Sequence, residues 1–181
     1  FATGGIGGVH RGDDYDVSAD LTELARTPVA VVCAGAKAIL DLPKTLEFLE
    51  TYSIPVIGYR TDCLPAFYSA TTAYSLPARV DDVKTLAKIL KIHWQLGLPS
   101  GVLITNPIPS EDEIPAEKIE PAIAKALQKA EKNRVSGKEM TPFLLAEISQ
   151  ITRGKSLAAN IQLIKNNVKM GAELAVAIQQ I

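Results

Sequence analysis

The sequence has few of the residues that mark a disulfide scaffold, a zinc site or a membrane anchor. Only 2 of its 181 residues are cysteine and 2 are histidine. Cys33 and Cys63 lie far apart without C-x-x-C or Cys/His spacing, so we expect no zinc site but two buried, reduced thiols. No apolar run reaches the roughly 18 residues of a membrane span, and no signal peptide is visible. We therefore expect an intracellular protein without a membrane partner, cytoplasmic first and organellar as the alternative.

The charge balance excludes one class of partner. The chain carries 19 Lys and Arg against 20 Asp and Glu, for a net charge of −1. A nucleic-acid-binding protein needs a clear excess of basic residues, so we expect no nucleic-acid partner. With 47% hydrophobic and 22% charged residues, the composition is that of an ordinary globular protein. A chain of this length buries roughly 70% of its unfolded surface and needs no covalent staple.

Short apolar runs bounded by proline or glycine predict strands buried on both faces at 29–34, 55–59 and 101–105. Residues 60–79 have no regular pattern. Helical patterns occupy 18–26, with Ser18 as its N-cap, 44–52, 81–97, 115–133, 141–152 and 155–180. This alternation predicts an α/β fold, a three-layer α/β/α arrangement around a mostly parallel or mixed sheet, with C-terminal helices. We expect one domain over 1–181.

Two helices carry side chains whose placement the pattern predicts. In the helix 81–97 we expect Trp94 in the core and His93 at the surface. The final helices are expected to act as a cap or an oligomer contact, and the last of them is 155–180. It carries one apolar stripe, formed by Leu157, Ile161, Ile164, Val168, Ala175 and Ile178.

The chain begins at Phe1 and enters a glycine-rich segment at once, with Gly4, Gly5, Gly7 and Gly8. Such segments normally follow a strand, so we expect this sequence to be the C-terminal portion of a longer protein, with a domain incomplete at its N-terminus. Glycines let a backbone turn tightly and bring N–H groups close to an anion. The pattern is neither GxGxxG nor a Walker loop, so a phosphate site and a structural turn both remain open.

Polar residues around this segment could take part in chemistry. Thr3 supplies a hydroxyl, Ser18 stands at a helix N-terminus where anions are favoured, and His10 and Arg11 supply proton transfer and charge. Lys37 follows a buried strand and Gly35, at the sheet edge where ligands of parallel sheets collect, as does the Asn106–Pro107 pair. An uncharged lysine there could form a Schiff base with a carbonyl. The alternative is a solvated lysine.

Acidic and amide side chains add two further candidates. The four aspartates Asp13, Asp14, Asp16 and Asp20 could bind Mg²⁺ or Mn²⁺, which often keep several waters. The alternative is a solvated acidic loop. Three asparagines interrupt the last helix and either lie on its exposed face or reach the site; they are Asn160, Asn166 and Asn167.

Taken together, several segments resemble the pseudouridine-5′-phosphate glycosidase family, which is also described as indigoidine synthase A-like. Two of them are long and specific: Phe1-Ala-Thr-Gly-Gly-Ile-Gly-Gly-Val-His-Arg-Gly12 and Val31-Val-Cys-Ala-Gly-Ala-Lys37. The supporting segments are Asp16-Val-Ser-Ala-Asp-Leu21, Asn106-Pro-Ile-Pro109, Thr141-Pro-Phe-Leu-Leu145 and Ser156-Leu-Ala-Ala-Asn-Ile161. They occur in order over nearly the whole chain.

The resemblance implies reversible cleavage of the C–C glycosidic bond of pseudouridine 5′-phosphate to uracil and ribose 5-phosphate. It also implies a lysine Schiff base on the opened ribose, a divalent metal, usually Mn²⁺, and a homotrimer of α/β/α subunits. The alternatives are a non-catalytic sugar-phosphate-binding fragment and a Schiff-base aldolase acting on another sugar phosphate.

By the same resemblance, each matching residue takes the role of its family position. Lys37 would form the Schiff base, Asp16 would bind the metal, and His10 would face the base and the reacting carbon. The substrate-contacting positions are Ser18 and Asp20, with Thr3 and Asn160 near the ribose phosphate. In the family, a general-acid glutamate and a substrate-binding lysine lie upstream of the glycine-rich segment. We therefore expect the upstream segment of the same protein to be a required partner.

Overall fold

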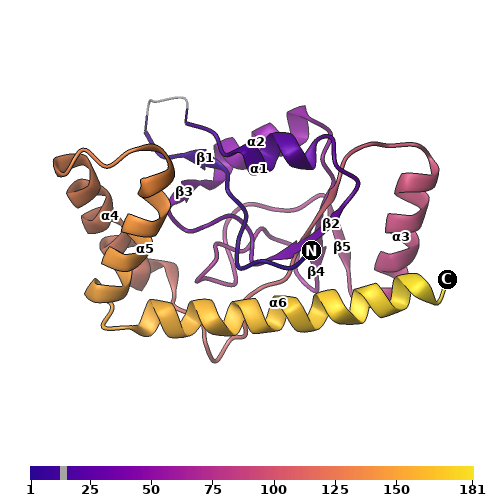
Figure 1. Ribbon diagram of the computed structural model, residues 1–181. Helices are drawn as coiled ribbons and strands as arrows, with labels where there is room; N and C mark the ends of the chain where they lie inside the picture. The colour runs from indigo at the N-terminus through magenta and orange to yellow at the C-terminus, as the bar shows by residue number, and fades with distance from the viewer. Residues whose placement is uncertain (13–15) are drawn as a thin grey trace.

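The computed structural model describes residues 1–12 and 16–181, apart from the side chain of Lys138. A parallel sheet lies between two layers of helices (Figure 1). Its strand order is β2-β6-β4-β5, with bounds β2 Ala30–Cys33, β6 Val102–Thr105, β4 Val56–Tyr59 and β5 Ala78–Val80. A parallel bridge between Ala2 and Val32 adds the start of the chain to the free edge of β2.

Alternate residues of each strand face opposite helical layers. Val32, Ile57 and Ile104 pack with α3 (Val83–Gln95) and α6 (Lys155–Gln179). Val31, Cys33 and Leu103 belong to the larger core cluster, which also contains buried residues of α1 (Ala19–Leu24) and α2 (Leu42–Thr51). The predicted α/β/α architecture and parallel sheet are confirmed.

Further helices and two short strands lie outside the parallel sheet and its helical layers. Helices α4 (Ala116–Lys132) and α5 (Met140–Ile151) pack against each other at one end of the molecule (Figure 1), with the 3-10 turn η1 (Gly137–Glu139) between them. Strands β1 (Val9–His10) and β3 (Leu40–Asp41) form a two-stranded antiparallel sheet. The sequence did not predict β1, β3 or β5, because strands of two or three residues are too short to show a period.

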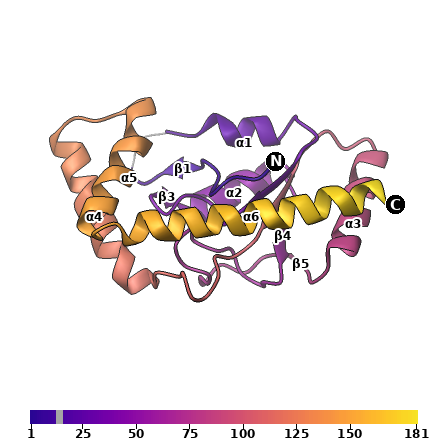
Figure 2. The ribbon, with the colours of Figure 1, turned by 60° about the horizontal axis from the view of Figure 1, so that its bottom comes forward.

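Helix α6 crosses the molecule from end to end (Figure 2). Its predicted apolar stripe is largely exposed, with relative exposures of 54% for Leu157, 45% for Ile161 and 51% for Val168. The face turned inwards consists of Ser156, Ala159, Leu163, Asn167, Met170, Leu174 and Ala177. Small side chains on that face let the helix lie close to the sheet: a Cβ on Gly171 would be 3.4 Å from the Cβ of Ala2.

Two predicted placements are wrong. His93 is buried rather than at the surface, because its Nε2 lies 3.1 Å from the carbonyl oxygen of Ser100, just before β6. Cys63 is only partly buried, although both thiols are free as expected. Trp94 is partly buried against the core cluster formed by the sheet with α3 and α6, and its Nε1 donates to the same Ser100 carbonyl.

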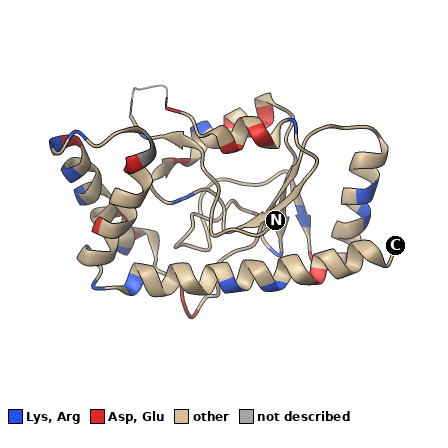
Figure 3. Ribbon diagram, viewed as in Figure 1, with Lys and Arg blue, Asp and Glu red and all other residues tan. Residues whose placement is uncertain are grey.

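Charges of both signs are spread over the surface helices, and both occur on α4 and α6 (Figure 3). Among the residues that the structure describes, none of the helices combines the length and the apolarity needed to cross a bilayer.

Candidate active site

The glycine-rich segment is extended and forms no tight turn; the alternative, a phosphate site, remains a prediction. None of Gly4, Gly5, Gly7 and Gly8 is among the glycines with positive φ, and parallel bridges pair Ala2 with Val32 and Ile6 with Ala36. The glycines instead permit close packing. A Cβ on Gly7 would lie 2.1 Å from the Ser18 hydroxyl oxygen, and one on Gly8 would lie 2.4 Å from that of Thr45.

Most N–H groups of this segment already donate within the protein. Thr3 donates to the carbonyl of Val32 at 3.0 Å and Ile6 to that of Gly35 at 3.1 Å. Gly7 donates to the Asp20 carboxylate at 2.7 Å and Val9 to the Thr45 hydroxyl at 3.0 Å. Within residues 3–9, the N–H groups of Gly4, Gly5 and Gly8 have no acceptor among the described residues and could meet an anion.

Lys37 lies on the loop that follows β2, at the predicted carboxyl edge of the sheet. Gly35 opens this loop with φ +83°, and a Cβ there would lie 1.9 Å from the carbonyl oxygen of Pro65. Lys37 N–H donates to the carbonyl of Ile6 at 3.1 Å, so the loop is fixed against the glycine-rich segment. The Lys37 side chain is partly buried.

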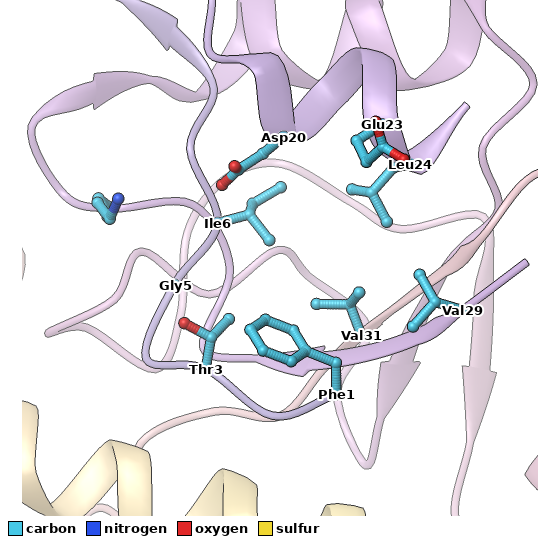
Figure 4. A pocket seen from close by; sticks show the side chains of 10 residues that line it. Phe1, Thr3, Gly5, Ile6, Asp20, Glu23, Leu24, Val29 and Val31 are labelled. Atoms are coloured by element: carbon cyan, nitrogen blue, oxygen red, sulfur yellow. The ribbon is translucent and has the colours of Figure 1, made fainter. Parts of the chain in front are cut away.

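A cavity of about 310 Å³ brings three of the predicted site residues together, namely Thr3, Asp20 and Lys37. They come from the glycine-rich segment, α1 and the loop after β2, and the Asp20 carboxylate projects from α1 towards the glycine-rich segment (Figure 4). The rest of the lining is largely apolar and consists of Phe1, Gly5, Ile6, Glu23, Leu24, Val29 and Val31. A hydroxyl, a carboxylate and an amine on one apolar wall could bind and react with a small polar carbonyl compound.

The remaining predicted residues that the structure describes are not part of the lining of this cavity. Ser18 caps α1, as predicted, by accepting a hydrogen bond from the N–H of Asp20 at 3.2 Å. His10 and Asp16 form a second group, with 4.0 Å between His10 Nε2 and Asp16 Oδ2, and Asp16 is exposed. Asp13 and Asp14 lie outside the described residues.

The three asparagines of α6 have different surroundings. Asn160 Oδ1 is buried, has no hydrogen-bond partner among the described residues, and would lie 3.2 Å from a Cβ on Gly4. Asn166 donates to the carbonyl of Pro107 at 2.9 Å. Asn167 is fully buried and donates to the carbonyl of Thr3 at 2.8 Å. Asn167 thus bonds the glycine-rich segment and Asn160 lies next to it, but neither side chain lines the cavity. Their role in the site stays a prediction.

Residues 1–177 match the family described as indigoidine synthase A like protein. The chain belongs to this family. A curated relative from Geobacillus kaustophilus, named pseudouridine-5′-phosphate glycosidase, is 57% identical over 97% of this chain and 59% of its own length. A second relative of that name, from Caldanaerobacter subterraneus, is 54% identical over 100% of this chain and 60% of its own length. The chain thus spans about 60% of the length of these relatives.

Two solved structures have the same fold. The indigoidine synthase A-like protein of Thermotoga maritima superposes with a TM-score of 0.89 at 39% identity, over 99% of this chain and 58% of that one. The prealnumycin C-glycosynthase AlnA, determined in complex with ribulose 5-phosphate, gives a TM-score of 0.91 at 37% identity, over 99% and 60% of the two chains.

The metal-binding side chains that the structure describes in this indigoidine synthase A-like chain suit a heavily hydrated metal ion. Among the described residues, no three His, Cys, Asp or Glu side chains gather in a possible metal site. Asp16 offers one exposed carboxylate near His10. A hard divalent ion such as Mn²⁺ or Mg²⁺ fits this arrangement only with water as most of its ligands.

Two residues hold the site of this indigoidine synthase A-like chain together: Arg11, which the sequence marked only as a source of charge, and Thr45, which it did not mark. Arg11 donates to the carbonyls of Ala38 and Leu40 and to the Glu120 carboxylate of α4. Thr45 joins β1 to the start of α2 by accepting from Val9 N–H and donating to the Asp41 carbonyl. Apart from Asp41, which precedes Thr45 by four residues, these partners are distant in sequence, and no local pattern marks them.

Proposed function

We propose that this chain carries the lysine-bearing part of a pseudouridine-5′-phosphate glycosidase. It would cleave the C–C glycosidic bond reversibly to give uracil and ribose 5-phosphate. The names of the two curated relatives support this substrate. The sugar phosphate in the C-glycosynthase structure supports the ligand class.

One observation carries the proposal: Thr3, Asp20 and Lys37 line the same cavity. They are far apart in sequence, and each belongs to a motif of the family resemblance. A chance arrangement of surface side chains has no reason to bring these three residues together.

The chemistry suits an amine rather than a pair of carboxylates, because a C-glycoside has no leaving-group oxygen for an acid to protonate. In the synthetic direction, the open-chain aldehyde of ribose 5-phosphate condenses with the amine of Lys37 and releases water. C5 of uracil then attacks the imine carbon and loses its proton. A sugar hydroxyl displaces the amine and closes the ring, and cleavage is the reverse of these steps.

Neighbouring residues would bind and orient the sugar phosphate. The main chain of Thr3 is already bonded on both sides, through its N–H to Val32 and its carbonyl to Asn167, so its hydroxyl is the group free to donate to phosphate. Asn160 Oδ1 is a buried acceptor without a partner among the described residues, and a sugar hydroxyl would supply the donor it needs. Fixing the phosphate orients the reacting carbon towards Lys37.

Metal and further chain segments complete the proposal. Asp16, with water, would hold a divalent ion, Mn²⁺ by the family resemblance, which would supply positive charge near the reacting groups. The family resemblance puts a general-acid glutamate and a substrate-binding lysine upstream of the glycine-rich segment. We propose that the upstream segment supplies them and that the complete protein is a homotrimer.

Borohydride trapping tests the central step. Ribose 5-phosphate and borohydride are added to the complete protein, and the adduct is mapped by peptide mass spectrometry. The proposal expects a reduced sugar adduct on Lys37 and none on the Lys37→Ala variant. If the protein binds ribose 5-phosphate but Lys37 stays unmodified, the Schiff-base mechanism is wrong. If it binds neither this sugar phosphate nor pseudouridine 5′-phosphate, the substrate assignment is wrong.

A further inference from the structure

Asn167 is a fully buried amide in the middle of α6, where a leucine would ordinarily be expected. Its relative exposure is 0%. Its Nδ2 lies 2.8 Å from the carbonyl oxygen of Thr3 and 3.4 Å from that of Gly4. Burial of an amide is unfavourable unless its groups are bonded, so the position of Asn167 depends on these contacts with the glycine-rich segment.

The other end of the amide is bonded as well. Asn167 Oδ1 accepts from Nδ2 of Asn106 at 3.0 Å, and both side chains are buried. The N–H of Asn106 donates to the carbonyl of Cys33 at 2.8 Å. A continuous chain of hydrogen bonds therefore runs from the end of β2 through Asn106 and Asn167 to Thr3. We refer to Asn106 and Asn167 as the amide pair.

The amide pair contacts Thr3 at the one main-chain group that the sheet does not hold. Thr3 N–H donates to Val32 in the sheet, and its carbonyl accepts from Asn167. With both groups bonded, the main chain of Thr3 is held against both β2 and α6. The Thr3 hydroxyl, which lines the candidate cavity, is oriented by this position.

We propose that Asn106 and Asn167 are positioning residues for phosphate recognition: they hold the Thr3–Gly4 peptides so that the Thr3 hydroxyl and the Gly4 N–H meet the phosphate of the substrate. This inference rests on the proposed function. It goes further by assigning a substrate-directed role to two buried side chains that do not touch the substrate. Loss of the amide pair should weaken binding of a phosphorylated ligand more than binding of the same ligand without phosphate.

Binding of pseudouridine 5′-phosphate and of pseudouridine is measured by calorimetry on the complete protein and its variants. For Asn167→Leu we expect affinity for the phosphorylated ligand to fall about tenfold, the effect of one lost hydrogen bond to a fixed group. Affinity for pseudouridine should change less than about twofold. Asn166→Leu is the matched control, because Asn166 is adjacent on α6 but bonds Pro107; it should leave the ratio of the two affinities unchanged.

The double variant Asn106→Leu plus Asn167→Leu separates positioning from stability. It removes both side-chain amides at once, so the Asn106 donor is not left unpaired, and the melting temperature should recover the part of the Asn167→Leu loss that this unpaired donor causes. Thr3 and Gly4 remain unheld, so phosphate selectivity should stay low. Recovery of phosphate selectivity together with stability, or unchanged selectivity in Asn167→Leu, would overturn the proposal. Failure of the unaltered protein to bind either ligand would instead refute the proposed function.

Discussion

The Arg11 guanidinium and the Glu120 carboxylate form a two-bond ion pair that joins the glycine-rich segment to α4. The same guanidinium donates to the carbonyl of Ala38 at 2.9 Å and to that of Leu40 at 3.2 Å. The Arg11 side chain therefore fixes the loop that carries Lys37, at the residues that directly follow the lysine.

Replacement of Arg11 by alanine should therefore lower the free energy of unfolding by about 1–3 kcal/mol, because two partly buried carbonyls lose their donors. Urea unfolding measures the change. Arg26→Ala is the control, since Arg26 pairs only with the exposed Glu23 among the described residues and such pairs contribute little. Equal stability of the two variants would contradict a fixing role for Arg11.

Gly35 should tolerate no side chain. Its φ of +83° is unfavourable for any residue with a side chain. In addition, an alanine Cβ would lie only 1.9 Å from the carbonyl oxygen of Pro65. We expect Gly35→Ala to cost more than about 3 kcal/mol in unfolding free energy. Gly97 has φ +77° with nothing within 4 Å of its Cβ position, so Gly97→Ala should cost only about 1–2 kcal/mol. Similar losses in both variants would show that backbone conformation, not the contact with Pro65, determines the cost.

The two cysteines should differ sharply in reactivity. Cys33 is fully buried in β2, and burial raises the pKa of its thiol to about 12. The thiolate is the nucleophile, so Cys33 stays protonated at pH 8. Iodoacetamide should label the partly exposed Cys63 first and leave Cys33 unlabelled until urea unfolds the protein. Peptide mass spectrometry reads the result, and early labelling of Cys33 in the folded protein would contradict its burial.

The exposed apolar face of α6 should associate with a second copy of the chain. Leu157, Ile161 and Val168 each expose 45% or more of their surface along one helix face, which is costly for a monomer in water. The variant Leu157→Lys plus Ile161→Lys should shift the molar mass in light scattering from trimer to monomer. Lys165→Glu, a polar change on the same helix, should leave the trimer intact. A monomeric unaltered protein would refute the proposed assembly.

Metal binding should depend on Asp16. Because Asp16 offers a single exposed carboxylate, we expect Mn²⁺ affinity to be modest and to fall about tenfold or more in Asp16→Asn. Free Mn²⁺ measured by electron paramagnetic resonance reports the binding directly, without any assay of activity. Asp112→Asn, a change of one acid far along the chain, controls for the loss of net charge. Unchanged Mn²⁺ binding in Asp16→Asn would place the metal elsewhere.

The sequence by itself determined the layers of the fold and the position of Lys37 at the carboxyl edge of the sheet. The short apolar runs around Val31 and Leu103 predict buried strands, and Ser18 predicts a helix N-cap. Both are local signals, because they depend only on neighbouring residues. These elements were predicted to within a few residues. Lys37 was placed at the carboxyl edge of the sheet for the same reason.

Only the tertiary structure decided which side chains meet. It extended the glycine-rich segment and packed it on Ser18 and Thr45, turned the apolar stripe of α6 outwards, and buried His93 and Asn167. Each outcome depends on partners far away in the chain, such as Thr3 for Asn167 and Glu120 for Arg11. A local pattern predicts the type of element. Which partner each buried polar group bonds is decided only when the whole chain has packed, because the partner comes from a distant segment.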